Sequence, residues 1–179
     1  MVSSQESDSL TDSGSLSDNK WVSAVGDTLY LAQADEQGNV NGLLQMQLDG
    51  SNGAKSKGEI PFSQDSYSSA YFSVLEDGTV YAADADGFFR CDVGDTNWQK
   101  LLQGVDTGFS LSDQWCRDIV ALSDGSVYAW FGSESGDKIM IYRYDPDAVI
   151  EVTEELTLYT VEESFFLQQA AVQYHKQHP

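Results

Sequence analysis

Three stretches that resemble one another decide the fold of this chain: Gly26-Asp27-Thr28-Leu29-Tyr30, Asp77-Gly78-Thr79-Val80-Tyr81 and Asp124-Gly125-Ser126-Val127-Tyr128. Each places a turn of Asp and Gly before a small hydroxyl residue and a strand-like run that ends in tyrosine. These tyrosines are 51 and 47 residues apart. Asp and Gly tolerate the positive φ that a tight hairpin needs, so each stretch predicts a hairpin that leads into a β-strand.

Short apolar or alternating runs separated by turn residues surround each stretch, which favours antiparallel strands. A repeat of roughly 40 to 50 residues, each unit holding a few strands, is typical of a propeller or a stacked array. We expect four strands in each unit: 21–25, 28–32, 43–48 and 59–62 in the first, 70–75, 79–83, 88–92 and 98–102 in the second, and 116–122, 126–131, 138–144 and 149–152 in the third.

The predicted fold class is mainly β, a partial β-propeller of about three four-stranded blades followed by a strand and a C-terminal α-helix. Residues 1–19 contain seven serines and four acids and are expected to be a disordered tether, because they cannot bury enough apolar surface to fold. Residues 20–153 would form the propeller repeats. Residues 154–179 would supply the strand and helix that open an α/β domain, so we expect the chain to be an N-terminal piece of a longer protein.

The charge of the chain excludes some partners. Twenty-nine acidic residues against nine basic ones give a net charge of −20. A phosphate backbone is bound through Lys and Arg, so a nucleic-acid partner is not expected. A polybasic membrane-surface mode is not expected either, and no apolar run is long enough to insert in a bilayer.

Few residues are suited to metal or nucleophilic chemistry. Both histidines, His175 and His178, lie in the last five residues, and the only cysteines are Cys91 and Cys116. The cysteines could pair, but two small buried thiols are the simpler interpretation. We therefore expect no metal and no cofactor.

Carboxylates and tryptophans are the remaining candidates for chemistry. Paired carboxylates occur at Asp84 with Asp86, Asp145 with Asp147, and Glu154 with Glu155, where turn formation explains the aspartates more simply than catalysis. A propeller-type glycan hydrolase would need a cluster of arginines, and the whole chain has only three arginines. We therefore expect that the protein is not an enzyme. The four tryptophans could stack on sugar rings or pack between sheets: Trp21, Trp98, Trp115 and Trp130.

The C-terminal segment 155–179, ELTLYTVEESFFLQQAAVQYHKQHP, resembles the first strand and first helix of the extracellular solute-binding proteins of ABC importers. Residues 21–152 look like the propeller-type repeats that precede such a domain in some Gram-positive lipoproteins. The phrase Tyr142-Arg143-Tyr144-Asp145-Pro146 is similar to the outer strand of kelch-like blades.

The resemblance implies a non-enzymatic, extracellular, cell-surface anchored protein that captures a small solute, with sugars as candidates, for an importer permease. It places the ligand near the loop between the first strand and first helix, which makes Thr160, Glu162, Glu163 and Ser164 the candidate ligand-binding residues. Backbone N–H groups at a helix start can bind a polar solute, although these side chains are also ordinary helix-start residues. The alternative is a self-standing β-propeller-like interaction module at the cell surface.

Overall fold

A computed structural model gives the fold over residues 21–49, 54–63, 69–109, 111, 114–143 and 145, and at five positions between 167 and 174. The strands are β1 (Val22–Val25), β2 (Thr28–Ala34), β3 (Val40–Leu48), β4 (Ala54–Pro61), β5 (Tyr71–Val74), β6 (Val80–Asp84), β7 (Gly87–Cys91), β8 (Gln99–Gln103), β9 (Gln114–Ala121), β10 (Ser126–Ser133) and β11 (Lys138–Arg143). A 3-10 turn, η3 (Gly104–Asp106), follows β8. The predicted mainly β class is confirmed.

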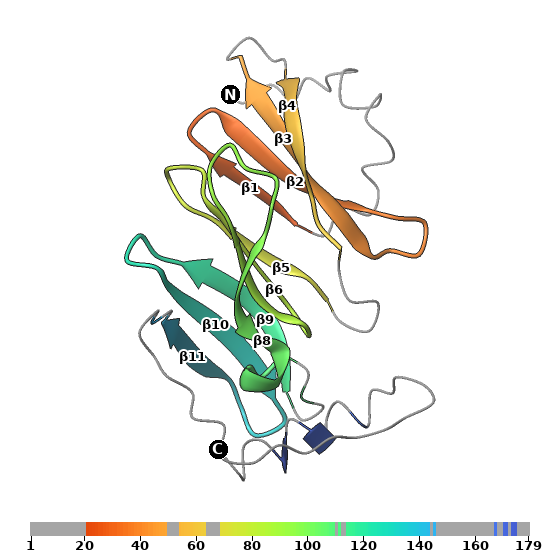
Figure 1. The fold of residues 1–179 in the computed structure, drawn as a ribbon, viewed down its shortest axis with the longest axis vertical. Coiled ribbons are helices and arrows are strands. Elements are labelled where there is room, and N and C mark those ends of the chain that lie inside the picture. The colour runs from red at the N-terminus through yellow and green to blue at the C-terminus, as the bar shows by residue number, and fades with distance from the viewer. Residues whose placement is uncertain are drawn as a thin grey trace, which may run out of the picture.

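The strands form three separate antiparallel sheets that are stacked along the long axis of the molecule (Figure 1). Sheet 1 has the order β1-β2-β3-β4, sheet 2 the order β5-β6-β7-β8, and sheet 3 the order β9-β10-β11 over the described residues. Within each sheet, every strand therefore pairs with its neighbour in the sequence, as the hairpin pattern predicted. The fourth strand expected for sheet 3, at 149–152, lies outside the described residues.

The turns at Asp77-Gly78 and Asp124-Gly125 are three-residue loops, one residue longer than the loop of a two-residue hairpin. Leu75 N–H donates to the Thr79 carbonyl oxygen at 2.9 Å, and Gly78 N–H donates back to Leu75 at 2.9 Å. The same pair of bonds recurs between Leu122, Gly125 and Ser126. A three-residue loop of this kind needs its last residue in the left-handed region, where Gly125 lies at φ 82°.

The first stretch differs, which corrects the expectation of three equivalent turns. Gly26 and Asp27 form a two-residue hairpin, because Val25 pairs directly with Thr28. The order of the two residues is reversed here, so glycine occupies the first position, at φ 57°. Each of the three stretches nevertheless leads into the second strand of its sheet, and each tyrosine lies on that strand.

Sheets 1 and 2 share one hydrophobic core. Tyr30, Ala32 and Leu43 of sheet 1 pack with Phe72, Val80 and Ala82 of sheet 2. Phe62, which follows β4, makes edge-to-face contacts with rings of sheet 2 and the segment before β8, at centroid distances of 5.2 Å to Phe72 and 5.2 Å to Trp98. Such contacts between aromatic rings stabilise the stacking of two sheets beyond the area that they bury.

Sheets 2 and 3 share a second core through the other face of sheet 2. Tyr81 and Ala83 alternate with Val80 and Ala82 along β6, so that all five residues of this strand are buried. Their partners on sheet 3 include Val127, Ala129 and Phe131. Sheet 2 is thus covered on both faces, which explains its nearly continuous apolar second strand.

The first strands of sheets 2 and 3 also touch through polar groups. Ala121 N–H on β9 donates to the Ser73 hydroxyl oxygen on β5 at 2.9 Å. Contacts also join β1 to β5. The first strands therefore gather on one side of the stack, while β4 and β8 form the opposite edge of sheets 1 and 2.

Several boundaries differ from those predicted from the sequence. Strand β4 begins at Ala54 instead of residue 59, because Lys55 and Ser56 continue the ladder beside β3 although their side chains are exposed. An edge strand tolerates such polar residues. It therefore lacks the apolar pattern from which strands are predicted. The C-terminal domain expected at 154–179, with its helix over 161–177, falls outside the described residues except at scattered positions.

Candidate binding site on sheet 3

The residues that the sequence assigned to ligand binding lie outside the part of the chain that the structure describes. This holds for Thr160, Glu162, Glu163 and Ser164. Of the candidate carboxylate pairs, only Asp84 with Asp86 is described in full. Among the residues singled out from the sequence, the structure describes the tryptophans, the aspartate turns and the cysteines.

The described aspartates hold turns. Asp84 is buried, and its Oδ1 accepts the Asp86 N–H at 2.9 Å. Asp77 Oδ1 accepts the Thr79 N–H at 2.8 Å, and Asp124 Oδ1 accepts both the N–H and the hydroxyl of Ser126. This is the turn chemistry that the sequence favoured over catalysis.

The same hydrogen bonds explain the perturbed carboxylates. Bonds from the Thr79 N–H and hydroxyl lower the pKa of Asp77, and bonds from the Ser126 hydroxyl and N–H lower that of Asp124. Hydrogen bonds from Asn39 and Asn97 likewise lower the pKa values of Asp35 and Asp95. A carboxylate that accepts several hydrogen bonds is stabilised in its charged form. None of these four carboxyl groups has the raised pKa of a general acid.

The four tryptophans fall into two classes. Trp21 and Trp98 pack against the core between sheets 1 and 2, and the Trp98 indole N–H donates to the Pro61 carbonyl oxygen at 2.6 Å. Trp115 and Trp130 lie on sheet 3 and remain 49% and 44% exposed. Packing between sheets thus explains the first pair and leaves the second pair unexplained.

Arg117 lies between the two exposed indoles. Its guanidinium carbon is 5.8 Å from the Trp115 ring centroid and 5.3 Å from that of Trp130. Trp130 pairs with Asp118 and Phe131 pairs with Cys116, which makes Arg117 the extra residue of a β-bulge. A bulge re-aims the side chain that it carries, and here the cation lies over both aromatic rings.

Gly132 makes room for this arrangement. A Cβ atom added at residue 132 would lie 2.7 Å from Arg117 Nε and 2.7 Å from Trp115 Nε1. Trp115 is the partner of Gly132 across β9 and β10. Both side chains therefore approach the backbone of β10 at a position that only glycine leaves open.

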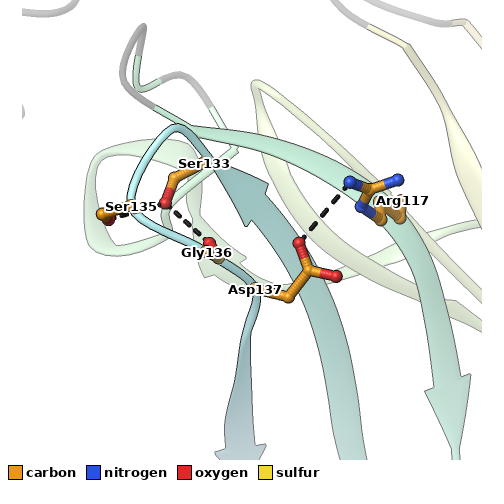
Figure 2. A network of polar contacts seen from close by, with 5 residues as sticks. All are labelled: Arg117, Ser133, Ser135, Gly136 and Asp137. Carbon is orange, nitrogen blue, oxygen red and sulfur yellow. Dashed lines mark hydrogen bonds and ion pairs between the residues drawn. The ribbon is translucent and has the colours of Figure 1, made fainter.

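The hairpin between β10 and β11 borders the same end of the sheet (Figure 2). The Ser133 hydroxyl donates to the Gly136 carbonyl oxygen at 2.7 Å and is 2.9 Å from the Ser135 hydroxyl. Arg117 Nη2 reaches Asp137 Oδ1 at 3.5 Å, so the cation links strand β9 to this hairpin. This exposed ion pair contributes little stability but orients both groups.

A pocket of about 590 Å³ lies beside Trp115 and this hairpin. Its lining is mostly polar: Gln114, Trp115, Ser133, Glu134, Ser135, Gly136, Asp137 and Lys138. Gln114 is buried and donates from Nε2 to the Gly108 carbonyl oxygen at 2.7 Å, which makes one wall rigid. One aromatic face beside carboxylates, hydroxyls and a lysine suits a polar ligand with an apolar face, such as a sugar.

A second, smaller hollow lies between sheets 2 and 3. It measures about 140 Å³ and is lined mainly by apolar side chains, among them Phe88, Leu102 and Val127. Arg143 and Asp145 are its charged lining residues, and most of the remaining wall is apolar, so it offers fewer polar groups than the pocket at Trp115.

Both cysteines are buried free thiols, as the simpler interpretation predicted. Cys91 belongs to the core between sheets 1 and 2, and Cys116 to the core between sheets 2 and 3. Burial raises the pKa of Cys91, and it raises the pKa of Cys116 to about 12. A thiol held in this protonated state is a poor nucleophile.

Over the described residues, no group of three or more His, Cys, Asp or Glu side chains is placed to hold a metal ion. The same part of the chain contains no helix with the length and apolar character needed to cross a membrane. No protein-family model matches the sequence, and no curated protein matches it either.

Proposed function

We propose that this protein is a non-enzymatic binding protein built on consecutive units of a β-propeller, and that it captures a carbohydrate at the pocket beside Trp115. The observation that carries the proposal is the exposed Trp115 indole at the edge of a polar pocket, with Arg117 lying over its ring. A sugar offers an apolar face to an indole and hydroxyls to carboxylates and hydroxyls.

Three features support the propeller. Each unit is a meander of consecutive strands, the sheets stack face to face, and the first strands of neighbouring sheets approach one another. Propeller blades have this arrangement, with their first strands nearest the common axis. Three such units would span part of a ring.

The proposal also holds that the protein does not catalyse a reaction. The described carboxylates with a shifted pKa are committed to turns, and the thiols with a raised pKa lie inside the two cores. An active site would be expected to hold a titratable group in a cleft with its pKa shifted towards neutrality. Recognition without catalysis fits these residues better.

The proposed protein delivers its solute to an ABC importer. Its proposed location is extracellular, anchored to the cell surface. They are supported by the resemblance of residues 155–179 to solute-binding proteins. In that arrangement the propeller pocket would be a second place of solute contact, beside the loop at Thr160 and Glu162.

The test is binding of the full chain to an array of glycans, followed by titration of any bound sugar with calorimetry and tryptophan fluorescence. We expect Trp115→Ala to weaken binding by about tenfold or more, which is about 1.4 kcal/mol. Val120→Ala is the matched control, because Val120 lies on the same strand and is 51% exposed. Absence of sugar binding, or equal losses in both variants, would refute the carbohydrate proposal.

The self-standing interaction module remains the second candidate function. A specific observation favours it, because sheet 3 also exposes apolar side chains that do not line the pocket, such as Ile141 at 53%. A protein partner would use this surface, whereas a sugar would not need it.

A further inference from the structure

Arg117 touches the lining of the pocket beside Trp115 without belonging to it. Its guanidinium carbon lies 5.8 Å from the Trp115 ring centroid, and its Nη2 lies 3.5 Å from Asp137 Oδ1. Trp115 and Asp137 both line the pocket, whereas Arg117 does not. An arginine in this place acts on a ligand through those two groups.

The chemistry of the guanidinium suits this double contact. A planar guanidinium stacks on an aromatic face and also presents a fork of N–H donors, so one side chain holds a ring and a carboxylate together. Trp130 adds a second ring, with its centroid 5.3 Å from the guanidinium carbon. The ion pair is exposed and therefore adds little to the stability of the fold. What it does is fix the relative position of two pocket residues.

Gly132 holds the same side chains from the backbone of β10. An added Cβ atom would lie 2.7 Å from Trp115 Nε1 and 2.7 Å from Arg117 Nε, closer than side chains pack. Gly132 does not lie in the left-handed region, so its backbone would accept alanine and only these contacts exclude it. The Trp115 ring is thus held between the backbone at Gly132 and the Arg117 cation.

We propose that Arg117 is a positioning residue of the sugar site. It fixes the Trp115 ring and the Asp137 carboxylate before the ligand arrives, and the sugar stacks on the face of the ring that Arg117 leaves open. This inference rests on the proposed function. A ring that is already ordered loses less entropy on binding, which corresponds to about two- to tenfold in affinity for one side chain.

The first test measures affinity by calorimetry. The probes are the methyl pyranosides of glucose, galactose and mannose, and the one that the wild type binds most tightly is used for every variant. Arg117→Met keeps the length of the side chain, removes its charge and should weaken binding about two- to tenfold. Arg117→Lys should fall between the two, because lysine still pairs with Asp137 but stacks less well.

Arg143→Met is the matched control for this substitution. Arg143 is exposed on the same sheet and does not line the pocket, so its variant should bind the sugar as the wild type does. Circular dichroism should show both methionine variants folded, because both arginines are at the surface. Equal affinities of the Arg117→Met variant and the wild type would overturn the proposal.

Gly132→Ala tests the same arrangement without removing any polar or aromatic group. Its Cβ atom should displace Trp115 and Arg117, and the sugar affinity should fall. Gly42→Ala is the matched control, because Gly42 is also a buried strand glycine and its Cβ atom would lie 2.8 Å from the flexible Glu59 side chain on sheet 1. An effect of Gly42→Ala as large as that of Gly132→Ala would contradict the proposed positioning.

A double-mutant cycle separates positioning from direct contact with the sugar. If Arg117 acts through the ring, Arg117→Met should cost less affinity in a Trp115→Ala background than in the wild type. Equal losses in the two backgrounds would mean that Arg117 does not act through Trp115, and the proposal would be wrong.

A measurement without sugar keeps the two proposals distinguishable. The four tryptophans are replaced by 5-fluorotryptophan, and their fluorine resonances are assigned from single Trp→Phe variants. Arg117→Met should shift the resonances of Trp115 and Trp130 but not those of Trp21 and Trp98, which pack against the core between sheets 1 and 2. An unmoved Trp115 resonance, or a shift of all four, would refute the positioning role. Absence of sugar binding with the expected shifts would refute the proposed ligand instead.

Discussion

The Tyr71 hydroxyl donates a 2.7 Å hydrogen bond to the Cys116 carbonyl oxygen, which ties the first strand of sheet 2 to the first strand of sheet 3. The two residues are 45 positions apart in the chain. Burial also raises the pKa of the Tyr71 hydroxyl, so it stays protonated and able to donate. Together with the bond from Ala121 to Ser73, it fixes how closely sheets 2 and 3 approach along their first strands.

Removing this hydroxyl should destabilise the whole stack. Tyr71→Phe is expected to lower the free energy of unfolding by about 1 kcal/mol, because the Cys116 carbonyl loses a part-buried donor. Urea denaturation followed by circular dichroism measures the change. Tyr128→Phe is the control, since its hydroxyl has no hydrogen-bond partner among the described residues, and it should change stability much less. Equal losses in the two variants would show that the Tyr71 bond is unimportant.

The loop between β9 and β10 should depend on its glycine. Gly125 has a φ of 82°, and nothing lies within 4 Å of an added Cβ atom. Any cost of Gly125→Ala is therefore conformational, about 1 to 2 kcal/mol. Gly125→Asn should cost less, because asparagine tolerates the left-handed region better. Thermal denaturation of both variants tests this order, and an alanine variant as stable as wild type would contradict it.

Acid should weaken the fold through the turn aspartates. Hydrogen bonds lower the pKa of Asp124 and Asp77 in the folded protein below the ordinary value of 3.8. The unfolded chain then binds more protons than the folded chain as the pH falls, so this stability is present above about pH 4 and lost below it. Asp124→Asn should flatten the acid limb of a curve of unfolding free energy against pH. Urea denaturation at a series of pH values gives this curve, and an Asp124→Asn variant with the acid limb of the wild type would contradict the prediction.

Alkali should weaken the fold through the buried thiol and phenol groups. Burial raises the pKa of Cys116 from 9.0 to about 12, and that of Tyr142 from 10.0 to about 12. The unfolded groups lose their protons first, so stability is complete below about pH 9 and falls as the pH rises towards 12. Cys116→Ala should make this fall shallower from pH 9 upward. A thiol reagent should modify both cysteines far more slowly in the folded protein than in urea, and fast labelling in the folded state would contradict their burial.

The tryptophans show where prediction from sequence reached its limit. Their positions near strands were predicted, but sugar stacking and core packing remained open for all four. Alternation along a strand assigns residues to two faces without telling which face another sheet will cover. Trp98 is part-buried because Phe62, 36 residues earlier, packs on it. Trp115 is exposed because the face that it occupies has no neighbouring sheet among the described residues.

From the sequence alone, Arg117 is only one of three arginines. Its role depends on a bulge at the step from Trp130 to Phe131 and on the absence of a side chain at Gly132. The signal that could have found it is the Trp-x-Arg spacing on β9 opposite a glycine on β10. That signal has meaning only once the pairing register is known.

The sequence by itself determined the three-fold repeat, the order of strands within each sheet and the turns that aspartate and glycine close. These features follow from contacts between residues that are close in the chain, such as Asp124 with Ser126 and Leu122 with Gly125. Only the tertiary structure decided which face of each sheet is covered, where β4 begins, and that Trp115, Arg117 and Asp137 meet. Those outcomes depend on register and on packing between distant strands, and the local alternation of apolar and polar residues does not encode either of them.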